Sequence, residues 1–152
     1  MHQGVNGIHH LAVSVPSLKA AEEFYVDKLG MEKSTRWDFE ASEEGDKISG
    51  LKNAAAKTLM VKAGNLYLEL FEFSSPIPKT QGDERPVCDH GYTHLAFDVD
   101  NENIEKVYKD WEAAGVRWHH PLKNDEEEGV KNAYGRDPFG NVIEIQALRP
   151  DV

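Results

Sequence analysis

The 152-residue sequence has little cysteine and no long apolar segment. Its single cysteine, Cys88, has no partner for a disulfide within the chain, which favours a reducing compartment. No apolar run approaches the roughly 20 residues that cross a membrane, and the first residues lack the basic and then hydrophobic order of a secretory leader. We therefore expect a cytoplasmic protein without a membrane partner.

Basic residues are also scarce. The sequence holds 17 lysines and arginines against 27 acidic residues, for a formal net charge of −10. Such a charge repels phosphate backbones, and no basic stripe offsets it, so nucleic acid is not an expected partner. With 39% hydrophobic and 29% charged residues, the composition is typical of a compact globular protein. The length fits one domain, or two small repeats that share a core.

The sequence contains an internal repeat. The segment HLAVSV begins at His10, and HLAFDV begins at His94. Each alternating segment is followed by apolar residues at helical spacing that stop at a glycine, Gly30 in the first copy and Gly115 in the second. The chain is therefore predicted to contain two copies of one strand and helix module.

The repeat divides the chain into four parts. We expect a mobile lead-in over 1–7, a first module over 8–73, a proline-bearing linker over 74–91 and a second module over 92–148.

In the first module, Ser17 is the predicted N-cap of a helix that closes at Gly30, and an acidic segment over 39–56 is predicted to be a mobile loop or lid. Alternating residues predict its strands, over 8–15, 31–38, 57–62 and 65–73. The second module is predicted to have a strand from His94 and a helix over 102–114. A short strand over 116–120, a solvated acidic turn over 124–129 and a closing hairpin over 131–136 and 141–148 follow.

Polar residues interrupt the alternation at matching positions. A histidine in the first strand of each module, and a glutamate in the last, stand out of phase with the aliphatic residues that would pack on the helix. These four residues are His10, Glu69, His94 and Glu144. If the two sheets curve around a shared interior, two imidazoles and two carboxylates converge there. That set suits a divalent transition metal, with room for water or substrate.

Other residues compete for these roles. Singly, a histidine or glutamate on a strand is more often an ordinary surface residue, and only the repetition favours a site. His9 stands beside His10, and Glu72 is the rival of Glu69 but falls on the leucine-bearing face of its strand. His119 and His120 have no counterpart in the repeat, so we expect them at the surface or at the rim of a cleft.

Four segments resemble those of a known family. They are GIHHLAVSVPSLKAAEEFYVDKLG, NLYLELFEF, GYTHLAFDVD and YGRDPFGNVIEIQ, and they are similar to segments of the vicinal oxygen chelate superfamily of glyoxalases, bleomycin-resistance proteins and extradiol dioxygenases. The resemblance covers most of the chain. It implies an α+β fold of paired βαβββ modules that form an open eight-stranded, barrel-like cleft around one metal, in a homodimer. It also implies that His10, Glu69, His94 and Glu144 bind this ion, which could be Ni, Zn, Co, Mn or Fe.

The ligand order His, Glu, His, Glu is most similar to that of glyoxalase I, followed by methylmalonyl-CoA epimerase. This resemblance implies a lactoylglutathione lyase-like isomerisation or an epimerisation through a metal-bound enediolate, on a small carbonyl compound or its thiol adduct. By the same analogy Glu144 is the general base and Glu69 the alternate. Two alternatives stay open: an iron-dependent extradiol-type dioxygenase, and a metal-free binding protein like the bleomycin-resistance proteins.

Candidate substrate-binding residues are less well defined. Arg136 and Tyr134 at the closing hairpin, and Tyr67 beside Glu69, are predicted to contact the substrate, and an arginine there would hold an anionic group. Arg36 and Arg85 are weaker candidates, since surface ion pairs explain them equally well. The 74–91 linker shows no clear clamp for glutathione, and the chain lacks the basic groove that the polyanion CoA would need.

Overall fold

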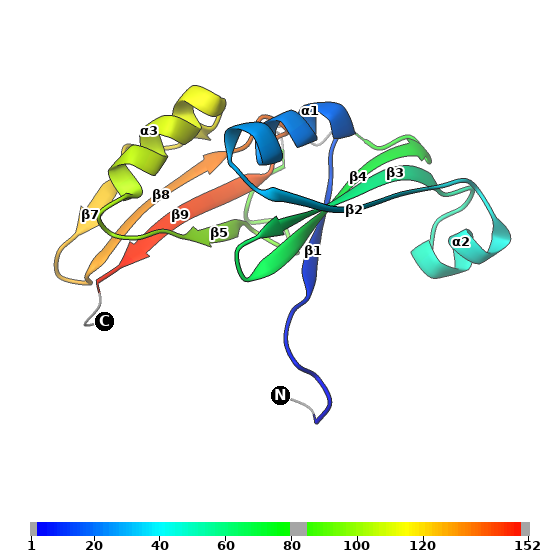
Figure 1. Cartoon of the computed structure of the whole chain (residues 1–152), viewed down its shortest axis with the longest axis horizontal. Helices are drawn as coiled ribbons and strands as arrows, with labels where there is room; N and C mark the ends of the chain where they lie inside the picture. Colours follow the sequence, from blue (N-terminus) through cyan, green and yellow to red (C-terminus); the bar gives the residue numbers. More distant parts are fainter. Residues whose placement is uncertain (1–2, 80–84, 150–152) are drawn as a thin grey trace. The chain divides into compact units, whose positions relative to one another are not determined.

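The computed structural model describes residues 3–79 and 85–149 and divides into two compact units, with the boundary after Lys79. Each unit begins with a strand and a helix and continues with antiparallel strands (Figure 1). In the described part of the chain, no helix is long and apolar enough to cross a membrane.

The first unit is built on a four-stranded sheet in the order β1-β4-β3-β2. Its strands are β1 (His10–Ser14), β2 (Glu32–Phe39), β3 (Ala55–Ala63) and β4 (Leu66–Ser75). β1 and β4 run parallel, and the other neighbours are antiparallel. The first and last strands of the unit therefore lie side by side.

One helical segment packs on this sheet. It begins as α1 (Leu18–Glu22) and continues as the π-helical segment η1 (Glu23–Lys28). The predicted N-cap is confirmed, because the Ser17 hydroxyl accepts a hydrogen bond of 3.2 Å from the Ala20 amide. Apolar side chains of the helix and the sheet form the core, namely Leu18, Ala21, Phe24, Tyr25, Leu59, Val61, Leu68 and Leu70. Alternation along β4 therefore leaves Glu69 on the opposite face of the sheet.

The predicted loop over 39–56 is wrong in its centre, where the chain forms helix α2 (Glu43–Ser49). The Ser42 hydroxyl caps its N-terminus by accepting from the Gly45 amide at 3.0 Å, and Gly50 ends it with φ of 70°. Asp46 then accepts from the amides of Asn53 and Ala54. None of the residues of α2 is buried, so the sequence lacks the apolar periodicity by which a packed helix is recognised.

The second unit repeats the plan with an addition. Its elements are β5 (Leu95–Asp98), α3 (Ile104–Ala114), β6 (Arg117–Trp118), β7 (Lys123–Asp125), β8 (Val130–Arg136) and β9 (Val142–Leu148). The sheet order is β5-β9-β8-β6, with β5 parallel to β9 and β7 paired to β8. Ile104 of α3 lies in a core with Ala133, Ile145 and Ala147.

The predicted α+β fold of paired βαβββ modules is confirmed, with α2 and β7 as additions. The predicted solvated turn over 124–129 begins two residues too early, because β7 extends to Asp125 and pairs with β8. This strand has three polar residues and no alternation to reveal it. The sheets of the described residues hold four and five strands, where eight in all were expected.

Candidate metal centre

The first unit brings His10 and Glu69 together. In the parallel register of β1 and β4, Ala12 lies opposite Glu69, and His10 is two residues earlier on the same face. The two side chains meet with His10 Nε2 at 3.1 Å from Glu69 Oε2. Glu69 is almost buried while His10 is partly exposed. We call His10 and Glu69 the first pair.

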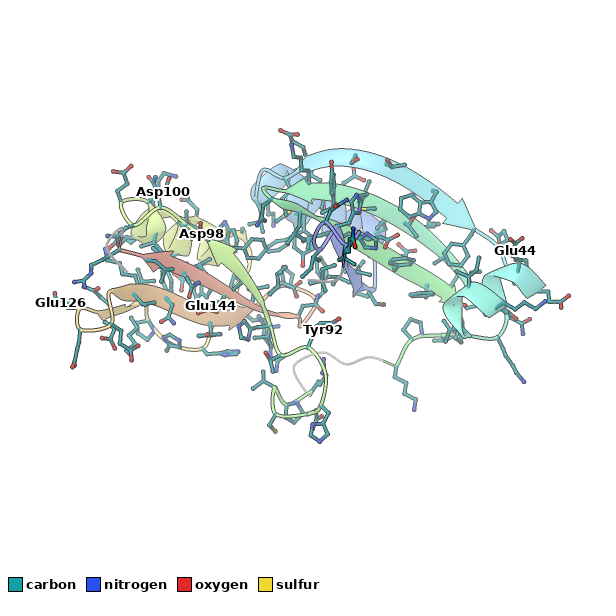
Figure 2. The ribbon with its side chains drawn as sticks, turned by 90° about the horizontal axis from the view of Figure 1, so that it is seen from below. Glu44, Tyr92, Asp98, Asp100, Glu126 and Glu144 are labelled. Carbon is teal, nitrogen blue, oxygen red and sulfur yellow. The ribbon has the colours of Figure 1, made fainter. Side chains whose placement is uncertain are left out.

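The second unit repeats this arrangement with His94 and Glu144, the second pair. Ala96 of β5 lies opposite Glu144 of β9, and His94 again precedes the alanine by two residues. His94 Nε2 lies 3.2 Å from Glu144 Oε2, and the carboxylate is buried. Figure 2 labels Glu144 on its strand in this unit. The same register therefore produces the same contact in both units.

In both pairs the residue before the histidine contacts the other ring nitrogen. The Thr93 hydroxyl lies 2.9 Å from His94 Nδ1, and His9 Nδ1 lies 2.9 Å from His10 Nδ1. A hydroxyl donates or accepts, so Thr93 suits either tautomer of His94. In the tautomer protonated at Nε2, His94 donates a hydrogen bond to Glu144. In the tautomer protonated at Nδ1, the Nε2 lone pair is free to bind a metal ion. This role of Thr93 was not predicted from the sequence, although Thr93 directly precedes His94.

The spacing within each pair fits a shared cation. Two ligands that each lie about 2.1 Å from one ion are about 3.0 Å apart at the right angle of an octahedral site and about 3.4 Å apart at the tetrahedral angle. The two measured separations are 3.1 and 3.2 Å. The described residues of neither unit gather a group of three or more histidine, cysteine, aspartate or glutamate side chains suited to a metal. Each unit therefore supplies two candidate ligands.

Glu144 is held by two side chains of β8. The Asn132 amide donates to Glu144 Oε1 at 3.2 Å, and the Tyr134 hydroxyl forms a hydrogen bond with the same carboxylate. Burial raises the pKa of the Tyr134 hydroxyl, and the hydrogen bond and charge of Glu144 raise it further. The Tyr134 ring also lies edge-on to His94, with centroids 5.1 Å apart. Asn132 was missed in the sequence, although alternation places it on the same face as Tyr134.

The rival residues have other contacts. His120 Nδ1 donates to the Pro121 carbonyl at 2.7 Å, and its Nε2 accepts from the Tyr134 amide, so both nitrogens are occupied. The Glu72 carboxylate accepts from the Leu18 amide at 2.6 Å and so caps the start of α1 on the helix-bearing face. These contacts account for both residues without a metal.

The predicted substrate-binding residues lie in different surroundings. Tyr67 is opposite His10 in the strand register and stacks on the ring of His9 at 5.2 Å. Arg136 donates to the carbonyl oxygens of Gly140 at 2.6 Å and Arg85 at 2.9 Å, which ties two of its donors to the backbone. Arg36 is opposite Leu59, on the helix-bearing face, and lies 3.8 Å from Asp38.

A cavity of about 750 Å³ lies on the Glu69 face of the first unit. Its lining includes Glu69, aromatic residues of β2 and β4, and apolar residues at α2, namely Trp37, Phe39, Phe71, Phe73, Ile48 and Leu51. Figure 2 labels Glu44, which comes from α2 and also lines this cavity, on its helix. We call this cavity the apolar pocket. It was not predicted from the sequence, because one of its walls is the helix that was expected to be a loop.

The family profile described as the glyoxalase/bleomycin resistance protein/dioxygenase superfamily matches residues 7–145. A 2-epi-5-epi-valiolone epimerase from Actinomyces sp is 33% identical over 110 residues, which cover 69% of this chain and 58% of the epimerase. The chain thus spans less than two thirds of the length of this curated relative.

Solved structures share the fold. A glyoxalase family protein from Bacillus cereus superposes with a TM-score of 0.81 at 20% identity, covering 97% of this chain and 98% of that one. A glyoxalase family protein from Enterococcus faecalis gives a TM-score of 0.65 at 28% identity, covering 93% and 97%. With the profile match over most of its length, the chain belongs to the glyoxalase/bleomycin resistance protein/dioxygenase superfamily.

Proposed function

We propose that this protein is a divalent-metal-dependent isomerase or lyase of the glyoxalase type. It would move a proton at a carbon next to the carbonyl group of a small carbonyl compound or its thiol adduct. The observation that carries this proposal is the repeated contact between histidine and glutamate, in the same register and at 3.1 and 3.2 Å. The similarity to an epimerase supports the same class of reaction.

The proposed ligands are the four side chains of both pairs, His10, Glu69, His94 and Glu144. Two imidazole nitrogens and two carboxylate oxygens are donors that Ni, Zn, Co, Mn and Fe accept. When bound, such an ion would polarise the carbonyl oxygen of the substrate and stabilise the negative charge that develops there. Thr93 and His9, at the Nδ1 atoms, would orient the two imidazole rings toward the ion.

The carboxylates of the pairs are the proposed proton carriers, with Glu144 as the general base and Glu69 as the alternate. A glutamate oxygen takes the proton from the carbon beside the carbonyl. In an isomerisation, where that carbon carries a hydroxyl group, the same glutamate delivers the proton to the carbonyl carbon, and the hydroxyl proton moves to the former carbonyl oxygen. In an epimerisation the first glutamate keeps the proton, and the second glutamate, protonated beforehand, donates its own proton to the opposite face of the same carbon. A positioned general base typically contributes about 100-fold to 10,000-fold in rate.

The test is a measurement of metal content and of proton exchange. Protein purified without chelators should hold stoichiometric metal, and chelation followed by a divalent ion should abolish and restore turnover. Candidate substrates are methylglyoxal with glutathione or another thiol, and cyclic polyhydroxy ketones. Incorporation of solvent deuterium beside the carbonyl reports the proposed step directly.

Other outcomes would contradict the proposal. Iron together with oxygen consumption on catechols would indicate the dioxygenase alternative. Purified protein without metal that takes up none would indicate a binding protein. We further propose a cytoplasmic homodimer, and light scattering on the eluted protein tests the dimer.

A further inference from the structure

We propose that the apolar pocket selects a neutral substrate with a flat, apolar substituent beside its carbonyl group, and excludes adducts of glutathione and CoA. This inference rests on the proposed function, because it names the substrate class of the same site. It goes beyond that function by deciding between a small neutral compound and an anionic thiol adduct.

The inner surface of the pocket suits a ring. Phe71 and Phe73 of β4 are stacked, with centroids 5.3 Å apart and planes within 11°. Trp37 and Phe39 of β2 line the same cavity, and the Trp37 ring is partly exposed and so accessible. The buried Thr58 hydroxyl donates to the Trp37 carbonyl, which fixes the β2 backbone at this point. Aromatic walls held in this way favour a flat apolar group through burial and stacking.

The charges around the pocket disfavour an anion. Among the described residues that line it, Glu40, Glu44 and Glu69 are acidic, and none is a lysine or an arginine. Glu40 and Glu44 are exposed at the rim, so an entering anion meets negative charge. Glutathione carries two carboxylates, and CoA carries several phosphates. Neither finds a cationic partner here, and a buried charge without a partner is costly.

A neutral group also fits better than a cation. Glu40 and Glu44 lie at the exposed rim of the pocket, and Glu69 is already in contact with His10 at 3.1 Å. The rim and the aromatic faces would attract a cation, but a cation over the rings would lose its hydration without a free buried counter-charge. A neutral substituent needs none, and it gains the free energy of apolar burial.

Helix α2 forms the outer wall. Its Ile48 is 81% exposed, and Leu51 just after it is 37% exposed, although both line the pocket. Ile48 in particular buries little apolar surface, so a bound ring would cover surface that otherwise faces water. The caps at Ser42 and Gly50 hold the helix in place without a ligand.

The position of Glu69 sets the orientation of the substrate. Glu69, Phe71 and Phe73 alternate along one face of β4, at intervals of about 6.8 Å for each two residues. A carbonyl group beside Glu69 therefore places a directly attached ring near Phe71, with Phe73 one interval further along the pocket. The pocket volume of about 750 Å³ is within the range of small-molecule sites.

Calorimetry on the full chain after metal removal tests the proposal. The probes are 2-hydroxyacetophenone, which is neutral, its para-carboxylate, a para-trimethylammonium analogue, S-hexylglutathione and CoA. We expect the neutral ketone to bind at least about tenfold more tightly than either charged analogue, and the last two to give no binding. Tighter binding of an anionic or cationic probe would overturn the proposal.

A matched pair of variants locates the binding. Ile48 and Ile77 are both 81% exposed, but only Ile48 lines the pocket. Ile48→Ala should weaken binding of the neutral ketone severalfold, and Ile77→Ala should leave it unchanged. Trp37→Ala should weaken it by about tenfold. Glu44→Lys should selectively improve binding of the carboxylate. Equal effects of Ile48→Ala and Ile77→Ala would place the ligand elsewhere.

Failure of this inference and failure of the proposed function are distinguishable. If the neutral ketone does not bind, or if glutathione adducts are turned over without competition from it, the pocket assignment fails while metal dependence stands. If the ketone binds but the protein takes up no metal, the proposed reaction fails and the pocket assignment stands.

Discussion

Both units pair a histidine with a glutamate, at 3.1 Å in the first and 3.2 Å in the second, but the surroundings of the two carboxylates differ. Glu144 is held by Asn132 and Tyr134 as well as by His94. Within the described residues, the polar side chain that contacts Glu69 is that of His10. Glu69 also lines the apolar pocket. The repeat thus preserves the proposed ligands, while the neighbouring residues distinguish a firmly held carboxylate from one that faces a cavity.

The largest expected effect tests whether the two pairs are equivalent. His10→Ala and His94→Ala should each lower the affinity for a divalent metal by more than about 100-fold, which exceeds the usual effect of residues that only orient ligands. Competition with a chromophoric chelator measures the affinity. His90→Ala, at an exposed histidine outside both pairs, is the control. A much smaller loss for one of the two variants would show that its pair is not part of the metal site.

The second prediction separates the roles of the glutamates. Glu144→Gln should lower kcat by about 100-fold to 10,000-fold, because an amide does not accept the proton, while its oxygen still approaches the metal. Glu69→Gln should cause a smaller loss in an isomerisation and an equal loss in an epimerisation that uses both carboxylates. Turnover with metal content measured on the same samples checks this. Full turnover of Glu144→Gln with metal bound would exclude it as the base.

A third prediction concerns the support of the second pair. Asn132→Ala should reduce metal affinity by about 10-fold to 100-fold, since Glu144 loses a donor that orients it. Thr93→Val keeps the shape of the side chain but removes the contact with His94 Nδ1, and should have an effect in the same range. Thr93→Ser, which keeps the hydroxyl, should retain the metal affinity of the unchanged protein. If the serine and valine variants behave alike, the hydroxyl contact has no role in metal binding.

The smallest effects concern helix α2, which lies at the pocket of the first unit. Ser42→Ala should destabilise the helix by about 1 kcal/mol, since the cap on the Gly45 amide is lost. Hydrogen exchange of the α2 amides measures the change. Ser42→Asp, which retains a capping oxygen, should preserve protection, and equal exchange in the alanine and aspartate variants would contradict the capping role.

The hydrogen bonds that the Asp46 carboxylate of α2 accepts from the backbone should depend on pH. Its hydrogen bonds from the Ala54 and Asn53 amides lower the pKa of its carboxyl below the ordinary value of 3.8. The stabilisation is therefore fully present above that value and is lost as the pH falls through the lowered pKa. Exchange at α2 should rise in this acidic range, and Asp46→Asn should remove the pH dependence. An unchanged profile in that variant would assign the effect to another group.

Much of the fold could be predicted because the internal repeat and the alternation of apolar and polar residues both indicate which side chains are buried. Leu68 and Leu70 pack under the helix, so the sequence also reveals that Glu69 lies on the other face. Helix α2 buries none of its residues and β7 is short and polar, so neither leaves that signal. The capping residues Ser42 and Gly50 were the available sequence evidence for the helix. The segment also contains Gly45 and Ser49, so the sequence alone does not show which serine and which glycine mark the helix ends.

The candidate site was predictable only in part, for a similar reason. His10, Glu69, His94 and Glu144 occupy equivalent positions of the repeat, whereas Asn132 has no equivalent role in the first unit. Its contact with Glu144 depends on the register between β8 and β9, which alternation alone does not determine. The apolar pocket depends in addition on a helix that the sequence did not reveal.

The pairing of β1 with β4, and of β5 with β9, joins the first strand of each unit to its last. Each contact between histidine and glutamate therefore closes a long loop that contains the rest of the unit, and it forms only when that unit has folded. A metal ion bound to these side chains would favour the folded form of both units by mass action. Loss of the proposed metal should then lower the thermal stability of the chain, so its binding would stabilise the fold as well as serve the proposed reaction.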